Sequence, residues 1–144
     1  MKGRDLEYRE YEPLFDFTGE FVKTARSEKA FYVTCDGYVT MTDGTGIVHC
    51  APAFGEDDAK VGRAYDLPFV QFVDGAGNMT EDTPYAGKFV KDADPLVLVD
   101  LDKEGKLFDA PKFEHEYPHC WRCDTPLIYY ARESWYIKET AVRD

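Results

Sequence analysis

The sequence predicts an α+β fold that is β-rich and barrel-like, with two short helices. Three observations favour this class. Short apolar segments with strand-like alternation recur along the chain, an Asp-Gly pair separates two of them, and only two stretches show helical spacing. Many short strands with few helices are typical of a barrel or a curled sheet.

The predicted strands rest on alternation and on turn residues at their ends. KAFYVTC (29–35) and YVTMT (38–42) flank Asp36-Gly37, which is a strong hairpin signal. GIVHCA (46–51) follows a Gly-Thr-Gly turn, and FVQFV (69–73) runs into the turn DGAGN. The last two predicted strands are TPLIYY (125–130) and SWYIKE (134–139).

Two helices are predicted between these strands. EDDAKVGRAYDL places apolar residues on one helical stripe and ends at Pro68; the stripe is Ala59, Val61, Ala64 and Tyr65. A second helix is expected from Asp92, capped by Asp92 or Asp94. Pro95 suits its first turn and Gly105 suits its end.

Length and charge restrict the function classes. A chain of 144 residues with 44% hydrophobic residues suits one folded domain, 1–144. Its 28 acidic and 17 basic residues give a net charge of −11, whereas a surface that grips duplex DNA or RNA is basic. We therefore expect no DNA partner. A nucleic acid end delivered by another part of a protein is still compatible with this charge.

Other classes are excluded by simple patterns. No apolar run approaches ~18 residues, so we expect no membrane partner. The charged start MKGRDLEYRE lacks the apolar centre of a signal peptide. Cys35 and Cys50 stand singly in strand patterns and suit small core residues, while Cys120 and Cys123 form a CxxC. This cysteine usage predicts a reducing, cytoplasmic location.

The segment GTGIVHCAPAFGEDD (44–58) has two interpretations. Glu56, Asp57 and Asp58 can simply be first-turn acids that offset the helix dipole. Alternatively, the segment forms a site in which the Gly-Thr-Gly turn approaches a ligand, the strand delivers His49, and a carboxylate anchors an ammonium group or polarises a water. Spacing alone favours the helix-dipole interpretation.

A family resemblance shifts this balance toward a site. DGTGIVHCAPAFGEDD resembles the signature of the editing domain of isoleucyl-tRNA synthetase, and YPHCWRCDTPLIYYARESWYIKET resembles the segment in which that family's chain returns to its catalytic core. EYEPLFDF and GKFVKDADPLVLVDLDKEGKLF also fit, so the resemblance covers nearly the whole chain. It implies a partial editing domain of the valyl, isoleucyl and leucyl synthetase type, with 115–144 as the returning segment.

The resemblance implies a proofreading role within an ATP- and Mg-dependent ligase that joins isoleucine to its tRNA. One missing methylene is worth only ~1–3 kcal/mol of discrimination, so a second site hydrolyses mischarged valyl-tRNA(Ile). Asp58 would bind the α-ammonium group of valine as the catalytic-site acid, and His49 would border the side-chain pocket. Gly44, Thr45 and Gly46 would lie against the 3′-terminal adenosine of the aminoacylated tRNA(Ile). The identity of any general base stays open.

The chain departs from the family pattern in what it lacks. It contains no TTTPWTLP-like threonine-rich strand, which forms one wall of the family's editing pocket, and no HIGH or KMSKS signature. We therefore expect a piece of a longer enzyme that packs on the rest of the synthetase chain. The piece should not itself bind ATP, and it should edit poorly or not at all.

The CxxC has the spacing of half a zinc site, whereas a structural zinc has four ligands. Some bacterial members of the family complete such a site with a distant second cysteine pair, which this chain lacks. His115 and His119 could substitute in principle, although their spacing matches no known finger. The other interpretation is a pair of reduced thiols.

Two rival functions are kept. One is a stand-alone hydrolase with a His49–Asp58 dyad, which lacks a clear nucleophile because no Ser stands in a nucleophile-elbow pattern. The other is a non-catalytic, acidic, β-rich interaction module stabilised by zinc. Long synthetase sequence on both sides of this segment would favour the editing domain over both.

Overall fold

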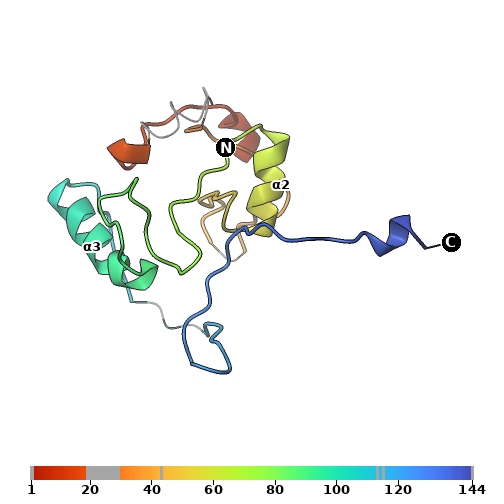
Figure 1. The fold of residues 1–144 in the computed structure, drawn as a ribbon. Helices are drawn as coiled ribbons and strands as arrows, with labels where there is room; N and C mark the ends of the chain where they lie inside the picture. Colours follow the sequence, from red (N-terminus) through yellow and green to blue (C-terminus); the bar gives the residue numbers. More distant parts are fainter. Residues whose placement is uncertain (1, 19–29, 43, 113, 115, 144) are drawn as a thin grey trace.

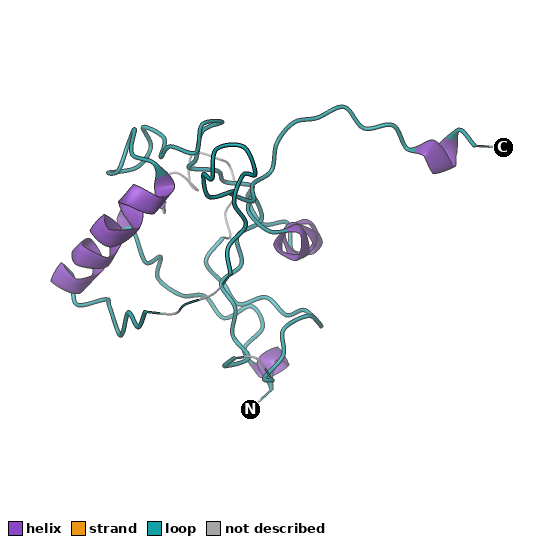
Figure 2. Ribbon diagram, turned by 90° about the horizontal axis from the view of Figure 1, so that it is seen from below, coloured by secondary structure: helices purple, strands orange, loops and turns teal. Residues whose placement is uncertain are grey.

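The computed structural model describes residues 2–18, 30–42, 44–112, 114 and 116–143. Its labelled elements are the α-helices α2 (Glu56–Ala64) and α3 (Val90–Lys103) and the short 3₁₀ turns η1 (Gly3–Asp5) and η2 (Glu139–Ala141); residues 16–18 are also helical. Figure 1 shows α2 and α3 on opposite sides of a body made of loops. The C-terminal segment leaves that body as an extended arm in both views (Figures 1 and 2).

The predicted β-rich, barrel-like fold is wrong for this structure. The described residues contain no β-strand, and Figure 2 shows helices and loops only. β-pairing is limited to isolated antiparallel bridges: Glu10 with Tyr32, Val73 with Met79, Asn78 with Phe89, and His119 with Pro126. The chain turns after Asp36 as predicted, but no ladder joins the segments that flank this turn, and residue 29 of the first one lies outside the described residues.

The physical reason is that the described parts of the alternating segments pair only at isolated points, and several of their apolar side chains are exposed. Ile47 and Val48 are 77% and 52% exposed, and Trp135 is fully exposed, although all three lie in predicted strands. An extended segment becomes a strand only when another segment satisfies its N–H and C=O groups. The chain has an accessible surface of 12262 Å², whereas a compact monomer of its mass exposes about 7,600 Å².

Helix α2 confirms the first predicted helix. Acids occupy its first turn and Arg63 its last, which suits the helix dipole. The helix ends at Ala64, before Pro68. Asp66 takes a left-handed conformation (φ 53°), and the Leu67 N–H donates to the Gly62 carbonyl at 2.8 Å, as in a Schellman cap.

Helix α3 confirms the second predicted helix and its end, but its predicted start is wrong. Gly105 has φ 66°, and the Lys106 N–H donates to the Leu101 carbonyl at 2.9 Å, which completes a Schellman cap. The helix begins at Val90, and its N-cap Phe89 makes no side-chain cap bond. Pro95 therefore lies inside the helix rather than in its first turn.

The buried core is small and couples the helices to the loops. Its described members are Tyr32, Ala53, Val61, Val73, Tyr85, Ala93 and Leu101, with Thr83 as a buried polar residue. The segment before the arm packs on this body: the Ala131 N–H donates to the Ala53 carbonyl at 2.7 Å. Among the described residues, no helix has the length and apolarity needed to cross a membrane.

Candidate functional site

The first turn of α2 divides its three acids into two groups. Glu56 and Asp57 are exposed and both pair with Lys60, at 3.2 and 2.8 Å. Hydrogen bonds from Lys60 to these carboxylates raise the pKa of its ammonium group. These two acids therefore behave as solvated helix-dipole residues.

Asp58 points the other way and is half-buried. Its Oδ1 accepts a hydrogen bond from the Tyr38 hydroxyl at 2.9 Å, and its Oδ2 accepts one from the Ala51 N–H at 3.1 Å. The carboxylate thus reaches back across the turn that precedes its own helix. Gly55 permits this path, because a Cβ at that position would lie 2.7 Å from Asp58 Oδ2.

The surroundings of Asp58 contain donors but no cation. No Lys or Arg in the described part of the chain forms an ion pair with Asp58. Burial and then the hydrogen bond to Asp58 raise the pKa of Tyr38 to about 12, so its hydroxyl stays protonated well above neutral pH. Burial, followed by the charge of Asp58, also raises the pKa of the Cys50 thiol. A half-buried carboxylate without a basic partner can accept a cationic group from a ligand.

His49 stands apart from this cluster. Its side chain is exposed, and no hydrogen bond joins it to Asp58 or to another residue of the described ranges. The residues that follow it do contact Asp58: Cys50 Sγ donates to the Asp58 backbone carbonyl, and the Ala51 N–H donates to its carboxylate. The structure therefore supports no His49–Asp58 dyad.

The Gly44-Thr45-Gly46 turn is compact and exposed. Thr45 Oγ1 bonds the Ile47 N–H and carbonyl at 3.3 and 3.4 Å. Gly46 has φ 79°, and an added Cβ would approach Met41 Cγ to 3.0 Å. Glycine at this position lets backbone, rather than a side chain, face an approaching group.

The CxxC forms a tight turn beside a short bridge. The Asp124 N–H donates to the Cys120 carbonyl at 2.8 Å, and Cys123 Sγ lies 3.2 Å from Thr125 Oγ1. Hydrogen bonds from Thr125 and then from Cys120 lower the pKa of the Cys123 thiol. No group of three metal-ligating side chains occurs among the described residues. The CxxC supplies two thiols, whereas a structural zinc needs four ligands. His119 bonds the Tyr117 carbonyl at 2.8 Å, and His115 lies outside the described residues.

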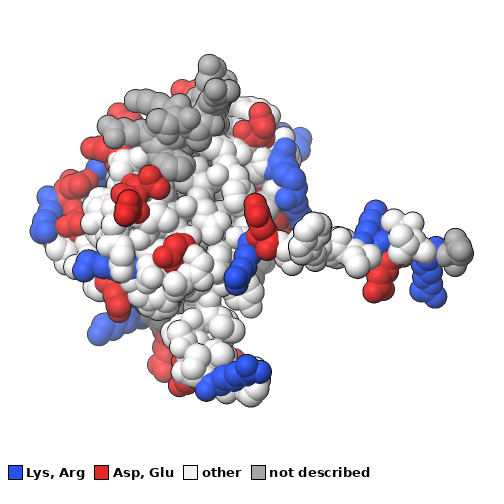
Figure 3. All heavy atoms as spheres, in the orientation of Figure 1, with Lys and Arg blue, Asp and Glu red and all other residues white. Residues whose placement is uncertain are grey.

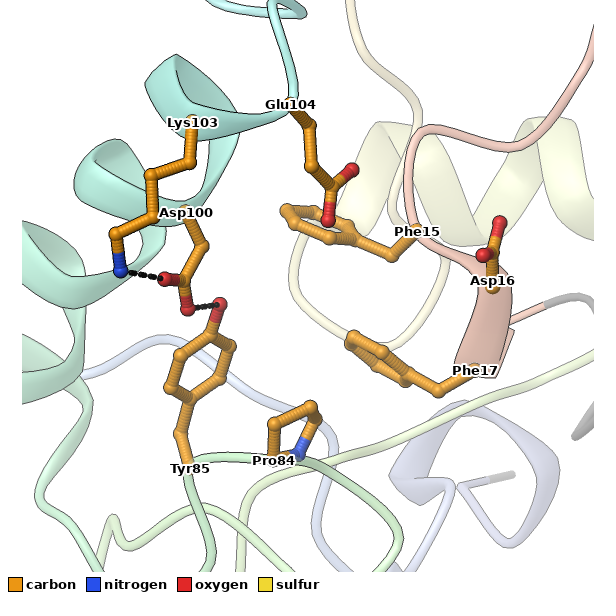
Figure 4. Close-up of a pocket in the computed structure, with 8 residues that line it drawn as sticks. All are labelled: Phe15, Asp16, Phe17, Pro84, Tyr85, Asp100, Lys103 and Glu104. Atoms are coloured by element: carbon orange, nitrogen blue, oxygen red, sulfur yellow. Dashed lines mark hydrogen bonds and ion pairs between the residues drawn. The ribbon is translucent and has the colours of Figure 1, made fainter.

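A cavity of about 410 Å³ lies elsewhere, between residues 15–17, residues 84–85 and the C-terminal end of α3. Figure 4 shows the Tyr85 hydroxyl and the Lys103 ammonium converging on the Asp100 carboxylate, each at 3.1 Å. Glu104 pairs with Lys106 at 2.7 Å. Because these two carboxylates are satisfied within the chain, the cavity is a weaker candidate than Asp58.

Sequence patterns missed Tyr38, Ala51 and Gly55 as parts of the Asp58 cluster. Tyr38 lies 20 positions before Asp58, and no periodicity relates the two. A signal did exist for Gly55, since a glycine stands directly before three acids where Ser, Thr, Asp or Asn is the usual cap.

Comparisons with known proteins give one consistent result. The chain is 51% identical over 145 residues to an isoleucine–tRNA ligase of Clostridium novyi, an alignment that covers all of this chain and 13% of the relative. The chain belongs to the isoleucine–tRNA ligase family. Similar matches are the isoleucine–tRNA ligases of Dehalococcoides mccartyi (49%, 99% of the chain, 15% of the relative) and Streptomyces coelicolor (49%, 99% and 13%).

The chain thus spans only about 13–15% of the length of these isoleucine–tRNA ligases. No family model matches it. Membership makes the chain part of an aminoacyl-tRNA synthetase, an enzyme class of protein biosynthesis.

Proposed function

We propose that the chain is part of the editing site of an isoleucine–tRNA ligase, with Asp58 as the residue that holds the α-ammonium group of valine misattached to the 3′ end of tRNA(Ile). The observation that carries this proposal is the half-buried Asp58 carboxylate, held by Tyr38 and Ala51 and lacking a described basic partner. An ammonium group supplies both the charge and the N–H donors that this carboxylate lacks.

The proposed reaction is hydrolysis of the valyl ester. Water adds to the ester carbonyl, the bond to the ribose oxygen breaks, and valine and free tRNA leave. Asp58 contributes orientation by binding the ammonium group beside the reacting carbonyl. His49 borders the valine side chain in this proposal, and the Gly44-Thr45-Gly46 turn lies against the terminal adenosine.

The surface charge fits a role at the tRNA end rather than along its body. Acidic and basic side chains are interspersed on the face in Figure 3, without a broad basic patch. A net charge of −11 opposes binding to a phosphate backbone. The rest of the ligase chain would therefore hold the tRNA and supply ATP and Mg binding, in the cytoplasm, while residues 115–144 return to its catalytic core.

Zinc remains a proposal for the ligase rather than for this chain. Cys120 and Cys123 would supply two thiolates, and other parts of the ligase would supply the rest. The rival function, an acidic and β-rich interaction module, is less well supported because the described residues contain no β-strand. The rival hydrolase is less well supported, because the described residues show no hydrogen bond between His49 and Asp58.

The test uses a chimeric ligase, in which this chain replaces the matching segment of the Clostridium novyi enzyme. Asp58→Asn should slow deacylation of purified valyl-tRNA(Ile) by about 10- to 150-fold, the value of a hydrogen bond to a charged group. Isoleucine activation should not change. Asp57→Asn is the matched control, because Asp57 is exposed and pairs with Lys60. Unchanged deacylation by Asp58→Asn would refute the proposed function.

A further inference from the structure

The two oxygens of Asp58 are held by groups of different origin. The Ala51 N–H reaches Oδ2 from the turn before α2, so it comes from the same local segment. Tyr38 reaches Oδ1 from a separate turn, which is itself held by a bond from the Tyr38 N–H to Asp36 Oδ1 at 3.2 Å. Tyr38 is therefore the tertiary restraint on this carboxylate.

One restraint alone leaves the carboxylate free to turn. Asp58 lies in the first turn of α2, where its side chain could instead rotate toward solvent as those of Glu56 and Asp57 do. The bond from Tyr38 fixes the position of Oδ1, and the bond from Ala51 fixes the position of Oδ2. A carboxylate offers about four acceptor positions, so two internal donors leave about two for a ligand.

The partner side chain suits a lasting restraint. Tyr38 is 37% exposed, and its hydroxyl bonds Asp58 Oδ1 at the surface of the molecule, where a ligand can also reach the carboxylate. Its hydroxyl is protonated over the whole neutral range, as that of any tyrosine is, and the raised pKa extends the range in which it can donate into alkali. No second side-chain donor to Asp58 is found among the described residues.

We propose that Tyr38 is the positioning residue of the ammonium site: its hydroxyl holds Asp58 so that the remaining acceptor positions face the α-ammonium group of the substrate. This inference rests on the proposed function. If Tyr38 acts only by positioning Asp58 for the ammonium group, its removal should slow the hydrolysis only of substrates that carry an ammonium group.

The experiment compares two substrates of the chimeric ligase. One is valyl-tRNA(Ile), and the other is 2-hydroxyisovaleryl-tRNA(Ile), in which a hydroxyl replaces the ammonium group. Tyr38→Phe should lower kcat/KM for valyl-tRNA(Ile) by about 5- to 30-fold, mainly through KM, and leave the hydroxy substrate within about twofold. The double variant with Asp58→Asn should be no slower than Asp58→Asn alone, because the two residues act as one unit.

Tyr85→Phe is the matched control. Its hydroxyl makes the same kind of bond, to Asp100 Oδ2 at 3.1 Å, but on α3. Its deacylation should equal that of the parent. Tyr38→His, which keeps a donor, should retain more activity than Tyr38→Phe. Unchanged hydrolysis of the hydroxy substrate reports that the site of the Tyr38 variants is folded.

The outcomes separate the two proposals. If Asp58→Asn is slow and Tyr38→Phe is normal, Tyr38 has no positioning role and the proposed function stands. If Tyr38→Phe slows both substrates equally, its role is structural and the inference is wrong. If Asp58→Asn has no effect, the proposed function itself fails.

Discussion

The Asp58 carboxylate occupies the space that a side chain on residue 55 would fill, and the glycine at this position leaves that space open. A Cβ on residue 55 would lie 2.7 Å from Asp58 Oδ2 and 3.0 Å from its Cγ. The backbone of Gly55 is extended (φ −140°, ψ 141°), a conformation that alanine also adopts. A substitution here therefore displaces the carboxylate without straining the backbone.

Gly55→Ala should consequently lower editing activity while leaving the stability of the fold nearly unchanged. The Asp58 side chain can rotate away, so the free energy of unfolding should change by less than about 1 kcal/mol. Deacylation of valyl-tRNA(Ile) by the chimeric ligase should fall by at least about tenfold, since Asp58 leaves its two donors. Gly37→Ala, where an added Cβ meets nothing within 4 Å, is the control. Normal deacylation by Gly55→Ala would show that the position of Asp58 is unimportant.

The raised pKa of Tyr38 predicts a loss of stability in alkali. The ordinary pKa of tyrosine is 10.0, and burial and Asp58 raise that of Tyr38 to about 12. Between these values the folded chain keeps a proton that the unfolded chain has released, so the free energy of unfolding falls as the pH rises. Below pH 10 the contribution of Tyr38 is fully present.

Denaturant unfolding of the 144-residue chain at about pH 9 and about pH 11 measures this loss. Tyr38→Phe removes one titrating group and should reduce the loss between the two pH values. The raised pKa values of Tyr11, Tyr32, Tyr65 and Tyr85 leave some loss in every variant. An equal loss in Tyr38→Phe and in the unsubstituted chain would contradict the raised pKa.

Local patterns predicted the helices well and the rest of the fold poorly. The end of α3 followed from Gly105, because a left-handed cap is a property of a few adjacent residues. Its start did not follow from Asp92. The helix begins at Val90, after the N-cap Phe89. The ring of Phe89 packs near Gly77 and its backbone bridges Asn78, which are contacts distant in sequence. The strands failed for the same reason, since pairing depends on partners that alternation in one segment cannot reveal.

The candidate site likewise has a part that local sequence predicts and a part that depends on contacts between distant segments. Spacing assigned all three acids to the helix dipole, which suits Glu56 and Asp57, and only the resemblance of the motif singled out Asp58. The bond from Tyr38 depends on how two turns meet in space, so neither pattern nor spacing contains it. For His49 the motif suggested a contact that the described residues do not show, because no hydrogen bond joins its ring to Asp58.

His49→Ala tests the size filter in the proposed pocket. If His49 borders the valine side chain, its removal should admit the larger isoleucine, and the chimeric ligase should begin to hydrolyse isoleucyl-tRNA(Ile). Valyl-tRNA(Ile) should still be hydrolysed, since Asp58 keeps its donors. The measurement is deacylation of both tRNAs side by side. Complete sparing of isoleucyl-tRNA(Ile) by the variant would remove His49 from the filter.

The cysteines should react in a defined order. Cys123 is exposed and hydrogen bonds from Thr125 lower its pKa, whereas Cys50 is half-buried with a raised pKa. Because the thiolate is the nucleophile, iodoacetamide should modify Cys123 before Cys50, as peptide mass spectrometry would show. Urea-unfolded chain should lose this order, and faster reaction of Cys50 would contradict the described environments. Zinc in the same reaction reports on the half-site, since metal binding would protect Cys120 and Cys123 together.

The isolated 144-residue chain should hydrolyse valyl-tRNA(Ile) at a rate near background. The chain contains no threonine-rich segment to form the second wall of the pocket, and misplacement of reacting groups by about 1 Å can cost ~100-fold in rate. Its net charge of −11 also repels the tRNA body, so the 3′ end would arrive by diffusion alone. The measurement compares the chain and the chimeric ligase at equal concentrations on the same valyl-tRNA(Ile). Circular dichroism of the chain checks that α2 and α3 are formed. Addition of the chain to a Clostridium novyi ligase whose own editing is inactivated should not restore hydrolysis. A chain that matches the chimeric ligase in rate would show that Asp58 and its neighbours form a complete site, and the assignment of a missing wall would be wrong.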